Sequence, residues 1–167
     1  IVQAVRRERP RVRLWVVGEG FFGEEAKLQK MARAAGWRVS DAASPSPEAD
    51  LILAGWVPLA EQPAHFAQAD VALYPFDDTL INRAKCPVKL MDLLAAGVPV
   101  VGDGVGQIAS VISGGETGVL VPPGEGEAFA AAVLALLDAP ARRQALGARA
   151  AEHVRAHVSW PALAARA

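Results

Sequence analysis

Short apolar runs that alternate with helical stretches constrain the fold of this chain more than any other feature. Six runs rich in Val, Leu and Ile have the length of strands, and they cover residues 12–17, 37–41, 50–56, 70–76, 98–103 and 118–122. Between them lie segments with apolar residues at helical spacing, such as residues 23–36 and 87–97. Strands that alternate with helices through short connections form right-handed βαβ units. The pattern therefore predicts an α/β fold, a Rossmann-like doubly wound parallel sheet.

Length and charge limit the domain count and the class of partner. The chain has 167 residues, 52% of them hydrophobic, and this is enough for one full core. The formal net charge is -1, which argues against nucleic-acid binding through a basic face. We therefore expect a single Rossmann-like domain over residues 1–167 and no nucleic-acid partner.

The few cysteines and histidines argue against a metal site. The chain has one cysteine, Cys86, and three histidines, of which His153 and His157 share one face of a helix without a third ligand nearby. We expect no bound metal and no cofactor. No apolar run reaches the roughly 18 residues of a membrane span, and no signal peptide is visible. We accordingly expect a cytoplasmic protein.

Both ends of the chain resemble parts of helices. Residues 1–9 form the last turns of a helix that Pro10 stops, without an initiator Met, and residues 159–167 look like a helix cut short. We interpret the chain as a fragment of a larger protein.

A glycine-rich turn after the first strand offers one functional reading. Residues 18–23, GEGFFG, match G-x-G-x-x-G, and Asp41 lies at about the spacing of a ribose-binding acid. Such glycines let a pyrophosphate approach a helix N-terminus, which would indicate an NAD(P)-binding oxidoreductase. Glu24 and Glu25, however, would place negative charge beside that phosphate. A tight turn that needs glycine only for its conformation is the alternative.

A second candidate site lies at the start of the helix over residues 87–97. Pro87 suits the first turn of a helix, and the backbone N–H groups of Val88 and Lys89 would then point out of the helix start. Lys85 and Lys89 add positive charge where the helix dipole already disfavours cations. Positive charge collected there suggests a bound anion such as a diphosphate. A solvated, charged helix start without a ligand is the alternative.

The same segment resembles the signature helix of the retaining group 1 glycosyltransferases, which have the GT-B fold. Members read P-x-K-L-x-E-x-x-A-x-G-x-P-V-V where this chain has PVKLMDLLAAGVPVV. Further stretches resemble the family in the same order: VRLWVVGEG, ILAGWVP, LAEQPAHFAQADVALYPF, VVGDGVGQIASVISGGETGVLVPPGEGEAFAAAVLALL and VSWPALAAR. The resemblance covers nearly the whole chain, and its specificity lies in the ordered set.

The resemblance implies the C-terminal, donor-binding half of such an enzyme, with its first strand missing. It implies transfer of a hexose from a nucleoside diphosphate sugar with retention, by a fragment that is inactive alone. The partners implied are the nucleotide-sugar donor and the N-terminal GT-B domain of the parent chain. Whether the parent enzyme is a peripheral membrane protein stays open. The implied donor-binding residues are Val57 and Pro58 beside the base, Lys85, Val88 and Lys89 at the diphosphate, and Asp92 at the ribose.

Departures from the family pattern limit what can be carried over. Members have two glutamates separated by seven residues, and these positions hold Ala84 and Asp92 here. A later family glutamate is replaced by Ser110. No catalytic residue can be named. We hypothesise that Arg83 and Lys85 replace cationic contacts that the family places near the start of the domain.

Other classes stay open. Asp77, Asp78 and Asp103 follow strands and weakly imitate the acidic cluster of a receiver-like or nucleotide-sensing module without turnover. A GT-B epimerase or phosphorylase is a further alternative.

Overall fold

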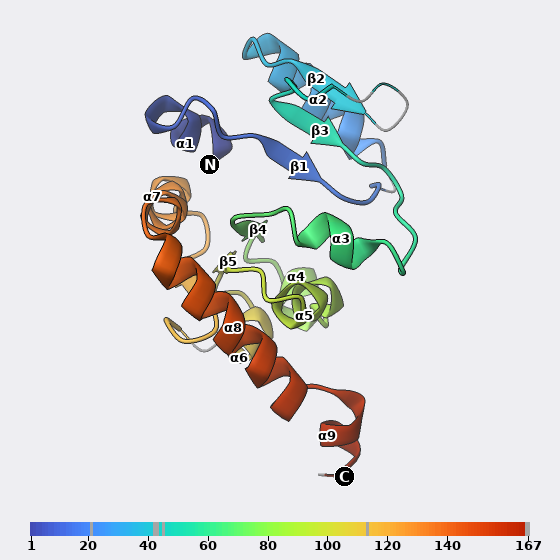
Figure 1. The fold of residues 1–167 in the computed structure, drawn as a ribbon, viewed down its shortest axis with the longest axis vertical. Coiled ribbons are helices and arrows are strands. Elements are labelled where there is room, and N and C mark those ends of the chain that lie inside the picture. Colours follow the sequence, from blue (N-terminus) through green and yellow to red (C-terminus); the bar gives the residue numbers. More distant parts are fainter. Residues whose placement is uncertain (21, 42–43, 45, 113, 166–167) are drawn as a thin grey trace. The chain divides into compact units, whose positions relative to one another are not determined.

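The computed structural model describes residues 1–20, 22–41, 44, 46–112 and 114–165. The chain divides into two compact units, Val2–His65 and Phe66–Ala167. Each unit has its own three-stranded parallel sheet (Figure 1).

The first unit is built on β1, β2 and β3. Its elements are α1 (Val2–Glu8), β1 (Leu14–Val16), α2 (Glu24–Ala34), β2 (Val39–Asp41) and β3 (Leu51–Leu53), and α3 (Gln62–Phe66) spans the point where the two units divide. The strand order is β1-β3-β2, so the central strand β3 is paired on both edges. Leu51 and Leu53 are buried and pack with Ala32 of α2. The central strand is apolar at each of its positions, as a strand covered on both faces should be.

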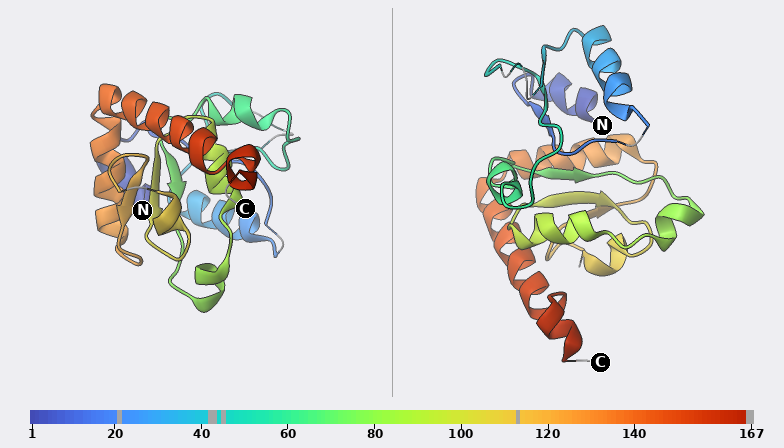
Figure 2. Two further views of the ribbon diagram at one scale, coloured as in Figure 1. Left: turned by 90° about the horizontal axis from the view of Figure 1, so that it is seen from below. Right: turned by 90° about the vertical axis from the view of Figure 1, so that its right-hand side faces the viewer.

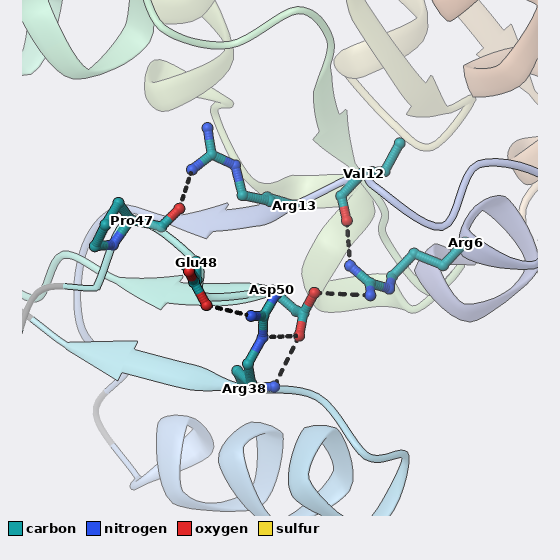
Figure 3. A network of polar contacts seen from close by, with 7 residues as sticks. All are labelled: Arg6, Val12, Arg13, Arg38, Pro47, Glu48 and Asp50. Carbon is teal, nitrogen blue, oxygen red and sulfur yellow. Dashed lines mark hydrogen bonds and ion pairs between the residues drawn. The ribbon is translucent and has the colours of Figure 1, made fainter.

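A polar network ties α1 to the amino ends of the strands (Figure 3). The Asp50 carboxylate accepts the Arg38 backbone N–H at 2.8 Å and the Arg6 guanidinium at 2.8 Å. Arg6 also donates to the Val12 carbonyl, and its guanidinium lies 4.8 Å from the centroid of the Trp37 ring. The Arg38 hydrogen bond is the main cause that holds the pKa of Asp50 below its ordinary value, and Arg6 adds to it.

The second unit contains the longer helices. Its elements are β4 (Ala72–Tyr74), α4 (Leu80–Ala84), α5 (Val88–Ala95), β5 (Val100–Asp103), α6 (Ile108–Val111), β6 (Val119–Val121), α7 (Gly126–Leu137), α8 (Pro140–His157) and α9 (Trp160–Ala164). The strand order is β4-β5-β6. α5 and α6 lie on one side of these strands and α7 on the other (Figure 2). Right-handed crossovers between successive parallel strands place α5 and α6 on a common face.

The core of the second unit depends on a close crossing of α5 and α8. Leu90 and Leu94 of α5 are fully buried, and they share one apolar cluster with Ala150 and Val154 of α8. At the crossing, a Cβ on Gly147 would overlap the carbonyl oxygen of Gly97. The glycine in α8 is therefore required by the approach of the backbones.

The structure confirms the six predicted strands, each in a shorter form, and the strands of both units pair in parallel, as expected. It adds one helix to the predicted elements. α4 was not predicted, and its N-cap is Thr79, whose hydroxyl accepts the Asn82 N–H. A five-residue helix has no usable apolar period, so only this N-cap could have revealed it. No helix among the described residues has both the length and the apolar composition of a bilayer span.

We predict that Gly147→Ala lowers the free energy of unfolding by about 1–3 kcal/mol, because the added methyl group overpacks the contact with Gly97. Chemical denaturation measures the effect. Gly126→Ala is the matched control, since a Cβ there meets no described atom within 4 Å and alanine favours the helix. Equal stability of the two variants would contradict the close crossing.

We also predict that the network around Asp50 makes stability depend on pH. The pKa of Asp50 is lowered by folding, so its contribution is present above the unfolded value of about 3.9 and is lost as pH falls through the folded value. Asp50→Asn should cost about 1–3 kcal/mol at neutral pH and progressively less in acid. Glu48→Gln, at the exposed end of the network, should change little. Unfolding midpoints from pH 2 to about pH 7 decide between these outcomes.

Candidate functional site

A buried carboxylate joins two strand-end loops of the second unit. Asp103 is the last residue of β5, and its Oδ2 accepts the backbone N–H of Phe76 at 2.8 Å. The side chain is buried, and burial raises the pKa of Asp103, with a smaller contribution from the charge of Asp77. The hydrogen bond holds the loop after β4 against the end of β5.

A close backbone approach joins the same loops a second time. Gly106, in the loop after β5, has φ +51, and a Cβ there would lie 2.7 Å from the Cα of Arg83. Only glycine fits this position without displacing the end of α4. The loop after β5 therefore rests directly on the segment that leads into α5.

Hydrogen bonds within the segment that contains α4 leave it little freedom. Asn82 donates through its side chain to the Asp77 carbonyl at 2.9 Å and through its backbone to the Thr79 hydroxyl at 3.2 Å. Arg83 binds both carboxylate oxygens of Asp78, at 2.6 and 2.7 Å, and this pairing lowers the pKa of Asp78. Asp78 thus counters the charge of Arg83 inside the segment, which weakens the hypothesis that Arg83 supplies a cationic contact to a ligand.

The start of α5 differs from the expected geometry at one amide. Pro87 is buried with φ -84 and ψ 62, an inverse γ-turn, so the Val88 N–H donates to the Cys86 carbonyl at 3.0 Å. In the described part of the chain, the Lys89 N–H has no hydrogen-bond partner. Of the two amides expected to face an anion, Val88 is already engaged and Lys89 is available.

Three charged residues lie at or near this helix start. Lys85 and Lys89 are exposed, and Asp92 is half-buried one turn further along α5. The Lys85 ammonium lies 5.6 Å from the centroid of the Phe76 ring. Sequence reasoning missed Phe76, because no spacing rule links it to Lys85.

The two residues expected beside a nucleobase belong to the first unit. Val57 is buried, and its carbonyl accepts the side-chain amide of Gln62 at 3.3 Å. Pro58 is exposed, and its carbonyl accepts the Glu61 N–H at 2.9 Å. The turn after β3 is therefore held by its own hydrogen bonds.

Backbone N–H groups of the glycine-rich turn after β1 are bound by glutamate carboxylates of the chain itself. Phe21 of this turn lies outside the described residues. The Gly20 N–H donates to the Glu25 carboxylate, and the Phe22 N–H donates to Glu24 Oε2 at 2.9 Å. The Gly20 bond lowers the pKa of Glu25. These carboxylates occupy amides that a pyrophosphate would need, which disfavours the dinucleotide reading.

His153 and His157 lie side by side, without a third metal ligand among the described residues. The rings of His153 and His157 on α8 lie 4.8 Å apart. Within the described ranges, no group of three or more His, Cys, Asp or Glu residues could hold a metal ion.

Comparison with known proteins places the chain among glycosyltransferases. Residues 1–139 match the family described as "Glycosyl transferases group 1". The D-inositol 3-phosphate glycosyltransferase of Kineococcus radiotolerans is 34% identical over 113 residues, which are 63% of this chain and 25% of that protein. D-inositol 3-phosphate glycosyltransferase 2 of Catenulispora acidiphila is 42% identical over 71 residues, which are 42% of this chain and 16% of that protein. The chain thus spans a quarter or less of the length of these two relatives.

Two solved structures show the same fold. HepE of Anabaena, in complex with UDP and glucose, has a TM-score of 0.71 at 20% identity, over 92% of this chain and 39% of that one. The C-terminal domain of LpcC, a group 1 family protein from Francisella tularensis, has a TM-score of 0.68 at 16% identity, over 93% and 74% of the two chains. The fold is α/β with parallel sheets, as in the C-terminal domain of GT-B glycosyltransferases. With most of its length matched to one family, the chain belongs to the group 1 glycosyltransferases.

Proposed function

We propose that this chain binds a nucleoside diphosphate sugar, and that its parent enzyme transfers the hexose to an acceptor with retention at the anomeric carbon. The observation that carries the proposal is the unpartnered Lys89 amide, within the described residues, at a helix start flanked by Lys85 and the Lys89 side chain. A helix N-terminus favours negative charge, and an incoming diphosphate would offset the unfavourable gathering of cations there.

In this proposal the start of α5 contributes to the reaction by electrostatic stabilisation of the leaving group. As the glycosidic bond breaks, negative charge builds on the diphosphate leaving group. The Lys89 amide and the ammonium groups of Lys85 and Lys89 would stabilise that charge from preorganised positions. The Val88 amide could contribute only after leaving the Cys86 carbonyl, so we assign the backbone contact to Lys89.

The remaining donor contacts rest on the family resemblance. Asp92 can accept hydrogen bonds from ribose hydroxyls, because its carboxylate is half-buried one turn from the helix start. We assign the nucleobase to the turn at Val57 and Pro58. A sugar nucleotide as donor agrees with the similar HepE structures, which contain UDP or UDP-glucose.

Titration of the 167-residue chain with UDP, GDP, ADP and NAD by calorimetry tests the binding proposal. We expect saturable binding of a nucleoside diphosphate. Lys85→Met and Lys89→Met should each weaken it by about 10- to 100-fold, since a charged hydrogen bond contributes about 1.5–3 kcal/mol.

Two variants serve as controls for this titration. Arg83→Met should have a smaller effect, because Asp78 already binds that guanidinium. Lys30→Met, an exposed cation on α2, should have none. An unchanged affinity for the nucleoside diphosphate in Lys85→Met and Lys89→Met would contradict the proposal. Tight NAD binding that depends on Asp41 would favour an oxidoreductase instead.

We further expect the isolated chain to bind the donor without transferring its sugar. It spans 25% of the Kineococcus glycosyltransferase, and the resemblance places much of the acceptor site in the other half of the enzyme. Incubation with a radiolabelled sugar nucleotide and candidate inositol phosphate acceptors measures transfer. Labelled product from the isolated chain would overturn this expectation.

A further inference from the structure

A stack of side chains at the end of β4 leads to Lys85. The rings of Tyr74 and Phe76 lie 4.9 Å apart, with an angle of 26° between their planes. The Lys85 ammonium lies over the Phe76 ring, 5.6 Å from its centroid. These three residues belong to the second unit, and the stack connects the sheet to the segment just before α5.

Neighbouring groups hold the two rings in place. The Phe76 backbone is bound by the buried Asp103 carboxylate at 2.8 Å. Burial raises the pKa of Tyr74, and the backbone of Leu90 in the first turn of α5 acts on its hydroxyl in the opposite direction. Both rings are partly buried and pack against the core cluster that contains Leu90. The face of Phe76 is thus a fixed surface, although it lies in a loop.

The contact restrains Lys85 without using its hydrogen-bond donors. A lysine side chain has a flexible four-carbon stem and about 2 kcal/mol of rotamer entropy. A ring face within about 6 Å attracts the ammonium electrostatically, by about 0.5–1 kcal/mol at exposed sites. The N–H groups stay available to an anion, since the ring contact does not require them. Arg83 is the contrast, because Asp78 takes up two of its donors.

We infer that Phe76 is a positioning residue, which holds the Lys85 ammonium ready for the diphosphate of the donor. The inference rests on the proposed function, since it assigns to Phe76 a part in the same site. Phe76 acts through Lys85 and need not touch the ligand.

A double-mutant cycle on the 167-residue chain tests the inference, with affinity for the nucleoside diphosphate that binds best as the readout. Phe76→Leu should weaken binding about two- to fivefold, the equivalent of the cation–π contact. In the Lys85→Met background, Phe76→Leu should have no further effect. Phe76→Tyr and Phe76→Trp should retain affinity, because they keep the ring face. A purely structural role would lower affinity in both backgrounds.

A measurement on the unaltered protein covers the case in which Phe76→Leu fails to fold. In a lysine-labelled sample, the ring current of Phe76 should shift the ε-methylene protons of Lys85 upfield. An unshifted Lys85 resonance, or single-variant effects that simply multiply in the double variant, would overturn the inference and leave the proposed function intact. Absence of any nucleoside diphosphate binding to the unaltered chain would overturn both.

Discussion

The buried carboxylate of Asp103 is the interaction on which the candidate site depends. A carboxylate at the end of a buried strand is costly unless a donor compensates it, and the Phe76 N–H is that donor. The bond draws the loop after β4 onto the end of β5, where Gly106 allows the backbone of Arg83 to approach. The start of α5, the ring of Phe76 and the ammonium of Lys85 owe their positions to these two contacts. Parallel strands bring their carboxyl ends to one edge, but a specific bond is needed to arrange the loops there.

Two helix starts in this chain have side chains of opposite charge beside them. At the start of α2, Glu24 and Glu25 supply carboxylates to nearby backbone N–H groups. At the start of α5 there is no acidic residue in the first turn, and lysines lie there instead. Anions stabilise the positive end of a helix and cations do not. The first helix start therefore has acidic side chains of its own beside it, whereas the first turn of the second has none.

Charge near α5 is also divided between cations that are occupied and cations that are available. The guanidinium of Arg83 is bound to Asp78 in a bidentate pair, which rigidifies the segment that contains α4. Lys85 is restrained by an aromatic face and keeps its donors. A site of this kind needs only a few local groups, so a net charge of -1 is compatible with recognition of a diphosphate.

The sequence by itself determined the α/β class, all six strands and the family, because alternating apolar runs and an ordered set of short motifs are local properties of the chain. It also predicted a candidate anion site at the start of α5, through Pro87 and the lysines around it, and this stays a prediction. Tertiary structure decided which groups there are available. The engagement of the Val88 amide by Cys86, the pairing of Arg83 with Asp78 and the contact of Lys85 with Phe76 depend on backbone angles and side-chain positions. These angles and positions depend on how segments distant in the sequence meet in space, and no spacing along the chain encodes that.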